Sequence, residues 1–424
     1  MSDARSVPRL TRPFDTTVTL PGSKSIALRQ LAISALAQAP STLHGVPRCD
    51  DADDMIDALR ALGTDIRETG PSRLTIEPAA TLGEGEIRLR LRLSGVSLRL
   101  LLAMAALRRD VTHLDGLPPL RARPNHDMID ALLELGCETS AVDGGHLPIS
   151  VRGPTVPAPE VSIGTSVTSQ HLSGLLLAAA RLPEGLVIRI KDDLVSAPYV
   201  AVTRNEMARR GVSVETLDAR TLRVAPGSYR GGLVRIEGDA SAATYHAALA
   251  TLHASTVRLD NLGTSTTQGD FAFFDLCDRL GAAVAATPEG VSITGPKQLR
   301  ALATVDMESM PDAAPTLMAM APFLPAPLRI TGLSTLRHKE CDRIACPARE
   351  LRKAGVTVDE GPDWIAIAPV SRPLPARFDT YDDHRMAMSL AVFASKAGGC
   401  EIADPGCVSK TYSDYWRDFE RVYR

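Results

Sequence analysis

The chain has 424 residues, of which 44% are hydrophobic and 23% are charged, and its formal net charge at pH 7 is −3. This length exceeds what a single hydrophobic core usually supports, so two domains are expected. The slight negative charge and an aromatic content of 4% argue against a general nucleic-acid or membrane-surface binder, although a local basic pocket is compatible with both.

The N-terminal region, residues 1–20, contains no apolar core of the kind that a signal peptide needs, and no stretch of the chain reaches membrane-spanning length. The seven cysteines are scattered, with no CxxC pair and no spacing typical of metal ligands. We therefore expect a soluble cytoplasmic protein with free thiols and no bound metal.

The first motif, residues 20–37, is a Pro-Gly turn followed by an apolar helix. Ser23, Lys24, Ser25 and Arg29 lie at the start of this helix. A helix N-terminus offers unpaired backbone N–H groups and a positive potential, which suit an anionic ligand. A serine cap beside a solvated lysine is the structural alternative for this segment.

A helix, a glycine and a short strand recur five times along the chain. The segments are 53–66, 126–139, 204–216, 273–286 and 348–360, and the glycines are Gly63, Gly136, Gly211, Gly281 and Gly355. Each glycine lies where a helix C-terminus needs a left-handed residue. Such segments are common in α/β proteins, but near-even spacing favours true repeats, with strands expected at 85–93, 186–190, 255–262 and 327–333. The pattern predicts an α/β fold of about six units that ends in a C-terminal helix.

The second motif, residues 164–180, is a hydroxyl-rich entry to another apolar helix. Thr165, Ser166, Thr168, Ser169 and Gln170 suit a phosphate, although they equally suit helix capping. Ser196 and Tyr199 follow it closely in the chain.

Two further motifs contain carboxylates. Asp312 opens the apolar helix at 310–321, where it is either an N-terminal cap or a positioned general base. Residues 336–355 combine Arg337, Lys339, Glu340 and Arg343, which form either a solvated helix start or an anion clamp with a proton carrier.

The last two motifs are residues 380–394, with His384 and Arg385, and residues 404–416, with Lys410. Any one of the six motifs could be ordinary capping chemistry. Together they place basic and hydroxyl groups at one helix N-terminus after another, which predicts a convergent anion site in a slightly acidic protein.

The motifs together resemble the EPSP synthase family of enolpyruvyl transferases. PGSKS with Arg29, TSQ, PDAA, KECDR, DDHRMAM and SKTYSDYW occur in the family's order, and 237–245 and 266–273 also match, so that the resemblance covers residues 20–415. It implies an inside-out α/β barrel in each of two similar domains, each built from three βαβαββ repeats. The domains would be 1–20 plus 240–424 and 21–239, with the active site in the cleft between them.

The implied reaction transfers the enolpyruvyl group of phosphoenolpyruvate to the 5-hydroxyl of shikimate 3-phosphate and releases phosphate, without a cofactor, in chorismate and aromatic amino-acid biosynthesis. The resemblance implies only small-molecule partners and a monomer. Shikimate 3-phosphate would be held by Ser25, Arg29, Thr168, Ser169, Gln170, Ser196, Tyr199 and Lys339. Phosphoenolpyruvate would be held by Lys24, Gly95, Arg123, Arg343, Arg385 and Lys410. Catalysis would fall to Asp312 as the base for the hydroxyl, Glu340 with Lys24 for protonation of the methylene carbon, and His384.

The chain departs from the family pattern at a few positions. Leu93 and Val96 replace two polar side chains beside Gly95, and Leu28, Pro119 and Thr335 also differ. Three interpretations therefore stay open: a working EPSP synthase, a specialised relative that acts on a different cyclic alcohol, and a non-catalytic binder of a phosphorylated ligand. The family's UDP-sugar branch is disfavoured, because the Ser-Lys-Ser start and the Asp-His-Arg motif belong to the shikimate branch.

Overall fold

The computed structural model describes residues 4–424, and the chain divides into two compact units. Unit 1 comprises the described residues up to Pro21 together with Glu237–Arg424, and unit 2 is Gly22–Ile236. The chain therefore leaves unit 1 after Pro21 and returns to it at Glu237.

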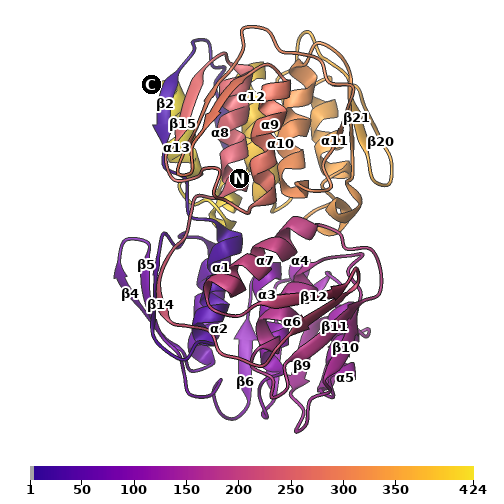
Figure 1. Ribbon diagram of the computed structural model, residues 1–424. Coiled ribbons are helices and arrows are strands. Elements are labelled where there is room, and N and C mark those ends of the chain that lie inside the picture. Colours follow the sequence, from indigo (N-terminus) through magenta and orange to yellow (C-terminus); the bar gives the residue numbers. More distant parts are fainter. Residues whose placement is uncertain (1–3) are drawn as a thin grey trace. The chain divides into compact units, whose positions relative to one another are not determined.

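Unit 2 contains three four-stranded sheets built to one pattern (Figure 1). In each sheet an edge strand runs parallel to a second strand, which pairs antiparallel with the hairpin that follows it. The sheets are, in spatial order, β14 (Gly232–Arg235), β3 (Ser41–His44), β5 (Arg73–Glu77) and β4 (Asp65–Gly70); β6 (Ile87–Arg90), β7 (Thr112–Asp115), β9 (His146–Arg152) and β8 (Glu138–Val142); and β10 (Glu160–Ile163), β11 (Leu186–Ile190), β13 (Thr221–Val224) and β12 (Val214–Asp218).

The inner helices of unit 2 are α1 (Lys24–Ala35), α3 (Gly95–Ala105) and α6 (Gln170–Ala179). All three are buried on nearly every side; α3 and α6 are mostly apolar, whereas α1 also buries Arg29, Gln30 and Ser34. A Cβ at Gly174 would lie 2.6 Å from the Arg99 carbonyl oxygen, so glycine is what lets α6 approach α3 closely. The other helices are α2 (Asp50–Ala61), α5 (His126–Glu134), α7 (Ala197–Arg209) and the short α4 (Pro118–Arg121).

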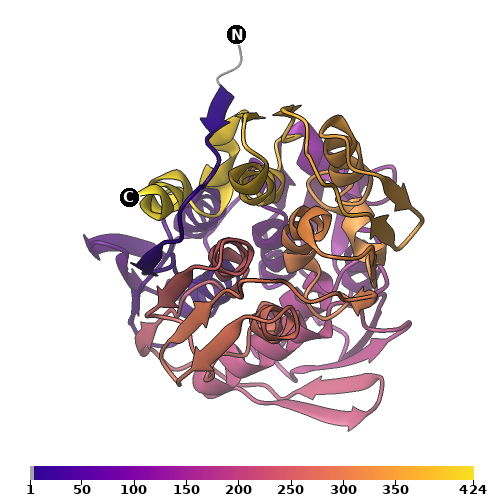
Figure 2. The ribbon, with the colours of Figure 1, turned by 90° about the horizontal axis from the view of Figure 1, so that it is seen from above.

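Unit 1 repeats this architecture. Its sheets are β2 (Asp15–Val18), β15 (Thr256–Leu259), β17 (Val291–Thr294) and β16 (Ala283–Ala286); β18 (Thr304–Asp306), β19 (Leu328–Thr331), β21 (Ile365–Ile367) and β20 (Val358–Glu360); and the three-stranded β1 (Ala4–Val7), β23 (Cys400–Ala403) and β22 (Arg377–Phe378). The inner helices α8 (Ala240–Leu252), α10 (Ala314–Met320) and α12 (His384–Ala397) contact one another, and seen from above they are viewed nearly end-on with the strands outside them (Figure 2). The outer helices are α9 (Phe273–Arg279), α11 (Ala345–Lys353) and α13 (Tyr415–Glu420).

The predicted α/β class and the predicted repeat are confirmed. All five predicted helix–glycine–strand segments are present, and their glycines have φ between +79° (Gly355) and +105° (Gly281). Of the four predicted strands, 186–190 is present with the predicted bounds as β11, and the other three are present but shorter: 85–93, for example, contains only β6 (Ile87–Arg90). The predicted C-terminal helix is present as α13, which ends at Glu420, and a 3₁₀ turn, Arg421–Tyr423, follows it.

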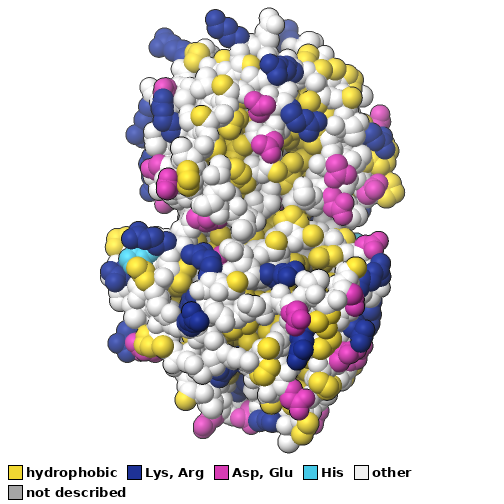
Figure 3. Space-filling view, viewed as in Figure 1, with side chains coloured by type: hydrophobic (Ala, Val, Ile, Leu, Met, Phe, Trp, Pro, Cys, Tyr) yellow, Lys and Arg dark blue, Asp and Glu magenta, His cyan; other side chains and the backbone are white. Residues whose placement is uncertain are grey.

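Charged side chains of both signs are interspersed over the face of the molecule in Figure 3, in keeping with the small net charge. No large area of this face carries charges of only one sign. Among the helices of residues 4–424, none combines the length and the apolarity that crossing a bilayer would require.

Gly153 follows β9 and packs on the C-terminal end of α3. Its backbone N–H donates to the Arg108 carbonyl oxygen at 2.7 Å, and a Cβ there would lie 2.0 Å from the Ala106 carbonyl oxygen. Gly227 occupies a comparable place after β13 and donates to the Ala180 carbonyl oxygen, but its nearest neighbour for a Cβ is 4.0 Å away.

The Gly153→Ala variant should therefore lose about 1–3 kcal/mol of unfolding free energy, because backbone atoms must shift to admit the methyl group. Urea unfolding followed by circular dichroism measures this loss. Gly227→Ala is the matched control and should change stability by less than about 0.5 kcal/mol. Equal losses in the two variants would show that close packing at Gly153 is not the cause.

Candidate active site

Arg343 lies at the centre of a carboxylate cluster in unit 1 and is only 1% exposed. Its Nε and Nη2 donate to Asp383 Oδ2 and Oδ1 at 2.7 and 3.0 Å. Nη2 also donates to Glu340 Oε2 at 2.7 Å, and Nη1 donates to Asp312 Oδ1 at 3.0 Å. Burial alone would lower the pKa of Arg343, but the three carboxylates outweigh burial and raise that pKa. The guanidinium is thus a fixed positive charge.

Helix capping orients the residues of this cluster. Asp383 Oδ1 accepts from the Arg385 backbone N–H at 2.8 Å and so caps α12 with the same carboxylate that pairs with Arg343. Asp342 Oδ1 accepts from the backbone N–H groups of Ile344 and Ala345, both at 3.0 Å, at the start of α11. Two helix starts therefore fix the backbone around Arg343.

Asp312 is held by two arginines. Arg385, in the first turn of α12, donates from Nη2 to Asp312 Oδ2 at 2.9 Å, and Arg343 donates to the other oxygen. Asp312 lies on a 3₁₀ turn, Pro311–Ala313, that leads into α10. Both carboxylate oxygens of Asp312 therefore accept hydrogen bonds from guanidinium groups.

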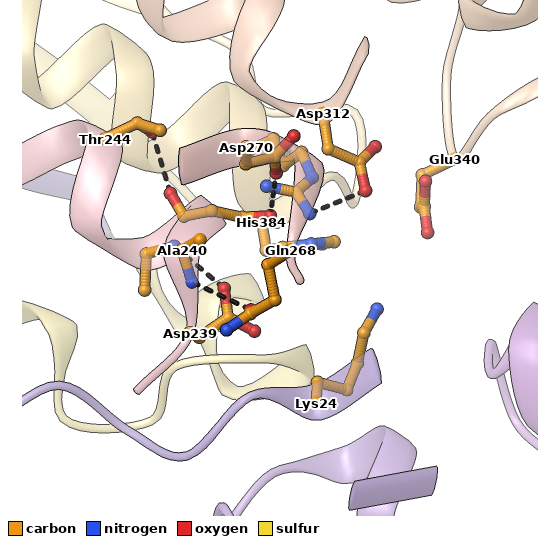
Figure 4. Close-up of polar contacts among 12 residues, drawn as sticks. Lys24, Asp239, Ala240, Thr244, Gln268, Asp270, Asp312, Glu340 and His384 are labelled. Atoms are coloured by element: carbon orange, nitrogen blue, oxygen red, sulfur yellow. Dashed lines mark hydrogen bonds and ion pairs between the residues drawn. The ribbon is translucent and has the colours of Figure 1, made fainter. Parts of the chain in front are cut away.

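Glu340 completes the cluster. Its Oε1 lies 3.8 Å from the Lys410 ammonium, at the end of the 3₁₀ helix Pro405–Lys410, and Lys410 is 3% exposed. His384 is buried, with Nδ1 3.7 Å from Asp383 Oδ1. Lys339 is the half-buried neighbour of Glu340 in the chain. The third, fourth, fifth and sixth sequence motifs thus meet in unit 1 (Figure 4).

Asp270 lies beside Asp312 and is buried (Figure 4). Burial and the charge of Asp312 raise the pKa of Asp270 to about 7, while Arg385 and a hydrogen bond from Ser241 Oγ oppose that rise. Asp270, which lies close to Asp312, therefore has a pKa near neutral pH.

In unit 2, the predicted site residue Arg29 is only 1% exposed. Its Nε donates to Thr203 Oγ1 at 2.7 Å and its Nη1 to the Ser25 carbonyl oxygen at 2.8 Å. Its Nη2 donates to the Tyr199 carbonyl oxygen at 3.1 Å and to Ser173 Oγ at 3.4 Å. Burial lowers the pKa of Arg29 to about 10, so the side chain remains charged at neutral pH. Ser25 and Tyr199 therefore meet at Arg29 through their backbones.

Other predicted residues of unit 2 form a second group. Ser169 Oγ donates to the Ser196 carbonyl oxygen at 3.4 Å, and Thr168 Oγ1 accepts from the Gln170 backbone N–H at 3.3 Å. Ser196, just before α7, has φ +53°, a strained conformation for a residue other than glycine. Thr165 and Ser166 instead donate to the Asp192 carboxylate, which joins this loop to the one before α7.

Gly95 opens α3 between two guanidinium groups. A Cβ at Gly95 would lie 2.6 Å from Arg123 Nη1 and 3.0 Å from Arg99 Nη1. Arg99 donates from Nη1 to Gln170 Oε1 at 2.7 Å and from Nε to His171 Nε2 at 3.3 Å. Burial keeps the pKa of His171 well below its usual value, so the ring is neutral and can accept this bond. A helix N-terminus and two arginines thus form a local positive site.

Lys24 donates to Asp51 Oδ2 at 3.1 Å, and Asp51 is buried at the start of α2. Sequence reasoning did not select Asp51, Asp383 or Asp270, although each supports a predicted residue. A carboxylate directly before a helix, as in the Asp-Asp pair ahead of His384, was the available signal for Asp383.

The positions that depart from the family pattern are dispersed. Leu28 is completely buried in the hydrophobic core of unit 2, and Pro119 is exposed on α4. Thr335 is 8% exposed in a 3₁₀ helix, Ser334–His338, of unit 1. Leu93 and Val96 are half-buried and lie within two residues of Gly95 in the chain. Within residues 4–424 no group of three or more His, Cys, Asp or Glu side chains is arranged to hold a metal ion.

These features define an α/β protein with an enzyme-like site for anions, in which fixed cations lie beside carboxylates able to exchange protons. The chain belongs to the EPSP synthase (3-phosphoshikimate 1-carboxyvinyltransferase) family, whose model matches residues 9–419. A 3-phosphoshikimate 1-carboxyvinyltransferase of Bordetella petrii is 37% identical over 414 residues, covering 94% of this chain and 92% of the relative. That of Nostoc punctiforme is 35% identical and covers 98% of both chains.

Solved structures show the same fold at lower sequence identity. EPSP synthase from Acinetobacter baumannii aligns with a TM-score of 0.82 and 21% identity, over 99% of this chain and 98% of that one. The enolpyruvyl transferase NikO from Streptomyces tendae aligns with a TM-score of 0.80 and 19% identity, over 100% and 98%.

The Asp383→Asn variant should lose about 3 kcal/mol or more of unfolding free energy, because it removes one charge from a buried ion pair. Asp382 is the control, since it precedes Asp383 in the chain and is exposed, and Asp382→Asn should cost less than about 0.5 kcal/mol. Chemical denaturation of both variants measures the difference. If Asp383→Asn were as stable as the wild type, the Arg343 pair could not be a structural element.

The raised pKa of Asp270 predicts a pH dependence of stability. Because the folded pKa is about 7 and the ordinary value is 3.8, the native state binds this proton more tightly than the unfolded chain does. The contribution of Asp270 to the free energy of unfolding therefore falls as the pH rises from about 4 to about 7 and is level above that.

Asp270→Asn removes this titration, so the wild type should lose about 2 kcal/mol more than the variant between pH 5 and pH 7. Urea unfolding at both pH values tests this, with the exposed Asp275→Asn as control. Parallel pH profiles for the wild type and Asp270→Asn would contradict the assignment.

Proposed function

We propose that the protein transfers the enolpyruvyl group of phosphoenolpyruvate to the 5-hydroxyl of shikimate 3-phosphate and releases phosphate, in the shikimate pathway of aromatic amino-acid biosynthesis. Membership of the EPSP synthase family over nearly the whole chain supports this. The observation that carries it is the unit 1 cluster, in which Arg343, Arg385 and Lys410 lie against Asp312 and Glu340.

The cations of the cluster suit phosphoenolpyruvate, which bears a phosphate and a carboxylate. Arg343, Arg385 and Lys410 would bind these groups and offset the repulsion between two anionic substrates. Gly95 and Arg123, with Lys24, are the unit 2 residues proposed to bind the same substrate. The absence of a side chain at Gly95 leaves the α3 N-terminus accessible to an anion.

Asp312 is the proposed base for the acceptor hydroxyl. Two arginines fix both of its oxygens, so its orientation does not depend on substrate. The hydroxyl oxygen would bond to C2 of phosphoenolpyruvate as the hydroxyl proton passes to Asp312. Glu340 would protonate C3 in the same step, and Lys24 would assist Glu340. The tetrahedral intermediate would then expel phosphate from C2 and return a C3 proton to Glu340, which gives the enolpyruvyl ether, while the proton held by Asp312 leaves with the phosphate. His384 would orient Asp383.

Shikimate 3-phosphate requires hydroxyl and cationic partners for its phosphate, carboxylate and ring hydroxyls. The residues proposed for it are Ser25, Arg29, Thr168, Ser169, Gln170, Ser196, Tyr199 and Lys339. The contacts around Arg29 and between Ser169 and Ser196 support a preformed set of donors. The proposal also takes residues 1–20 plus 240–424 and 21–239 as the two family domains, and a monomer acting in the cytoplasm.

A second candidate keeps the chemistry and changes the acceptor. Leu93 and Val96, beside Gly95, replace polar side chains at the proposed phosphoenolpyruvate site, and each lost hydrogen bond to a charged ligand costs about 1.5–3 kcal/mol. A chain that evolved toward another cyclic alcohol would show such changes.

Purified protein supplied with phosphoenolpyruvate and shikimate 3-phosphate should release phosphate with a kcat on the order of 1–10³ per second. Mass spectrometry of the organic product should identify the enolpyruvyl ether. Asp312→Asn should lower kcat by about 10²–10⁴-fold, the usual contribution of a general base. Asp306→Asn, an exposed aspartate of the same unit, should leave kcat unchanged.

Phosphate release with other cyclic alcohols, but not with shikimate 3-phosphate, would support the second candidate. Binding of shikimate 3-phosphate with no turnover of any acceptor would overturn both proposals in favour of a non-catalytic binder.

A further inference from the structure

The loop that leads into α12, residues 379–382, has an uncommon backbone conformation. Tyr381 and Asp382 both have φ +55°, in the left-handed region that residues other than glycine seldom adopt. Such residues persist only where surrounding contacts hold them. Asp383 follows directly, donates from its backbone N–H to the Thr380 carbonyl oxygen at 2.9 Å, and caps α12. The conformation of this loop therefore determines where the Asp383 carboxylate lies.

Glu350, in α11, is the residue that holds this loop, and its side chain is completely buried. Its Oε1 accepts a hydrogen bond from the Tyr381 hydroxyl, and its Oε2 accepts from the Asp379 backbone N–H at 3.0 Å. Burial and the hydrogen bond with Glu350 raise the pKa of Tyr381 to about 12, so the hydroxyl keeps its proton and can donate. One buried carboxylate thus binds the loop at two places.

Two cations of α11 complete these contacts. The Lys353 ammonium lies 2.6 Å from Glu350 Oε2 and 2.8 Å from Asp379 Oδ2. Arg349 donates from Nη1 to the Tyr381 hydroxyl oxygen at 3.4 Å, and its guanidinium carbon lies 5.8 Å from the centre of the Tyr381 ring. Both oxygens of Glu350 therefore have hydrogen-bonding or charged partners, as a buried carboxylate requires.

The loop connects Glu350 to the carboxylate cluster of unit 1. Asp383 accepts from Arg343 through both of its oxygens, and it also accepts from the Arg385 backbone N–H. Arg343 and Arg385 in turn bind the two oxygens of Asp312, the proposed base. A shift of the loop would move Asp383, and both arginines would lose the partner that places them.

We propose that Glu350 is a positioning residue for the reaction: by holding the 379–382 loop it places Asp383, and with it the arginines that bind phosphoenolpyruvate. The effect on catalysis rests on the proposed function, whereas the hold on the loop does not depend on which reaction takes place. Without the Glu350 carboxylate, the loop loses the contacts that offset its left-handed residues, and its backbone relaxes toward ordinary conformations.

Steady-state kinetics of phosphate release by the full-length protein tests the effect on catalysis. Glu350→Ala should raise KM for phosphoenolpyruvate about 10-fold and lower kcat about 10- to 100-fold, because displacements near 1 Å at a positioned site cost about 10²-fold. KM for shikimate 3-phosphate should not change, since all of its proposed binding residues except Lys339 lie in unit 2. A loss of global stability alone would lower kcat by reducing the folded fraction and would leave both KM values unchanged.

Two further variants separate positioning from folding. Tyr381→Phe removes only the hydroxyl that donates to Glu350, so it should raise KM for phosphoenolpyruvate in the same direction by a smaller factor. Glu350→Gln keeps an acceptor for the Asp379 N–H and gains an amide that can donate to the Tyr381 oxygen, so it should recover most of the activity that Glu350→Ala loses. Glu360→Ala is the matched control, because Glu360 pairs with Arg352 of α11 at 3.1 Å rather than with the loop, and its kinetics should equal those of the wild type.

Amide hydrogen exchange provides a readout that needs no substrate. In the wild type the backbone N–H groups of Asp379, Asp383 and Arg385 are all hydrogen-bonded, so a peptide that spans residues 379–385 should exchange slowly. In Glu350→Ala and in Tyr381→Phe this peptide should exchange about 10-fold faster. Exchange in β15 and β17 of the same unit should stay as in the wild type.

Unchanged exchange at residues 379–385 in both variants would overturn the proposal, because the loop would then not depend on Glu350. Faster exchange with wild-type kinetics would overturn the positioning role. A wild type without turnover would overturn the proposed function, and with it the role of Glu350 in that reaction, while the exchange result would still show whether Glu350 holds the loop.

Discussion

The burial of one guanidinium group is the constraint on which unit 1 depends. A charge as deeply buried as that of Arg343 is stable only where partners replace its hydration. The partners come from separate places in the chain: Asp312 before α10, Glu340 three residues upstream of Arg343, and Asp383 at the start of α12. Arg343 thereby ties α10, α11 and α12 together, and the same ion pairs orient the groups proposed to carry the chemistry. The ion pairs of Arg343 therefore stabilise unit 1 and also position the carboxylates of the proposed mechanism.

Unit 2 also places arginine side chains close together, and there the backbone geometry at a glycine allows it. Its positive site combines the α3 N-terminus with Arg99 and Arg123, and the absence of a side chain at Gly95 is what lets these guanidinium groups approach. A neutral His171 supports Arg99 from the buried side. Arg99 donates to the neutral side chains of Gln170 and His171, whereas Arg343 in unit 1 donates to three carboxylates.

Much of the fold could be predicted from sequence because it depends on local chemistry. Apolar helices and the glycines that end helices in a left-handed conformation can be recognised from short segments of sequence. The repeats follow from the spacing of five such glycines, Gly63, Gly136, Gly211, Gly281 and Gly355. The pairing within the candidate site could not be predicted in this way. Asp312 and Arg343 are 31 residues apart, and nothing local shows that they meet. Leu28 shows the converse: a difference from the family pattern within a site motif lies in the hydrophobic core.

The insertion of unit 2 between two strands of one sheet fixes an order of events during synthesis. In unit 1, β2 pairs with β15, in the register Asp15 to Thr256, so the complete sequence of unit 2 leaves the ribosome before that partner exists. At about 5–20 residues per second, β2 waits on the order of 10–50 seconds. Strand β1 waits longer, since Ala4 pairs with Ala403. Unit 2 has all of its own strands by Arg235 and can fold meanwhile. The N-terminal strands must stay unpaired through this interval, and their shortness and mixed polarity reduce the hazard of wrong pairing.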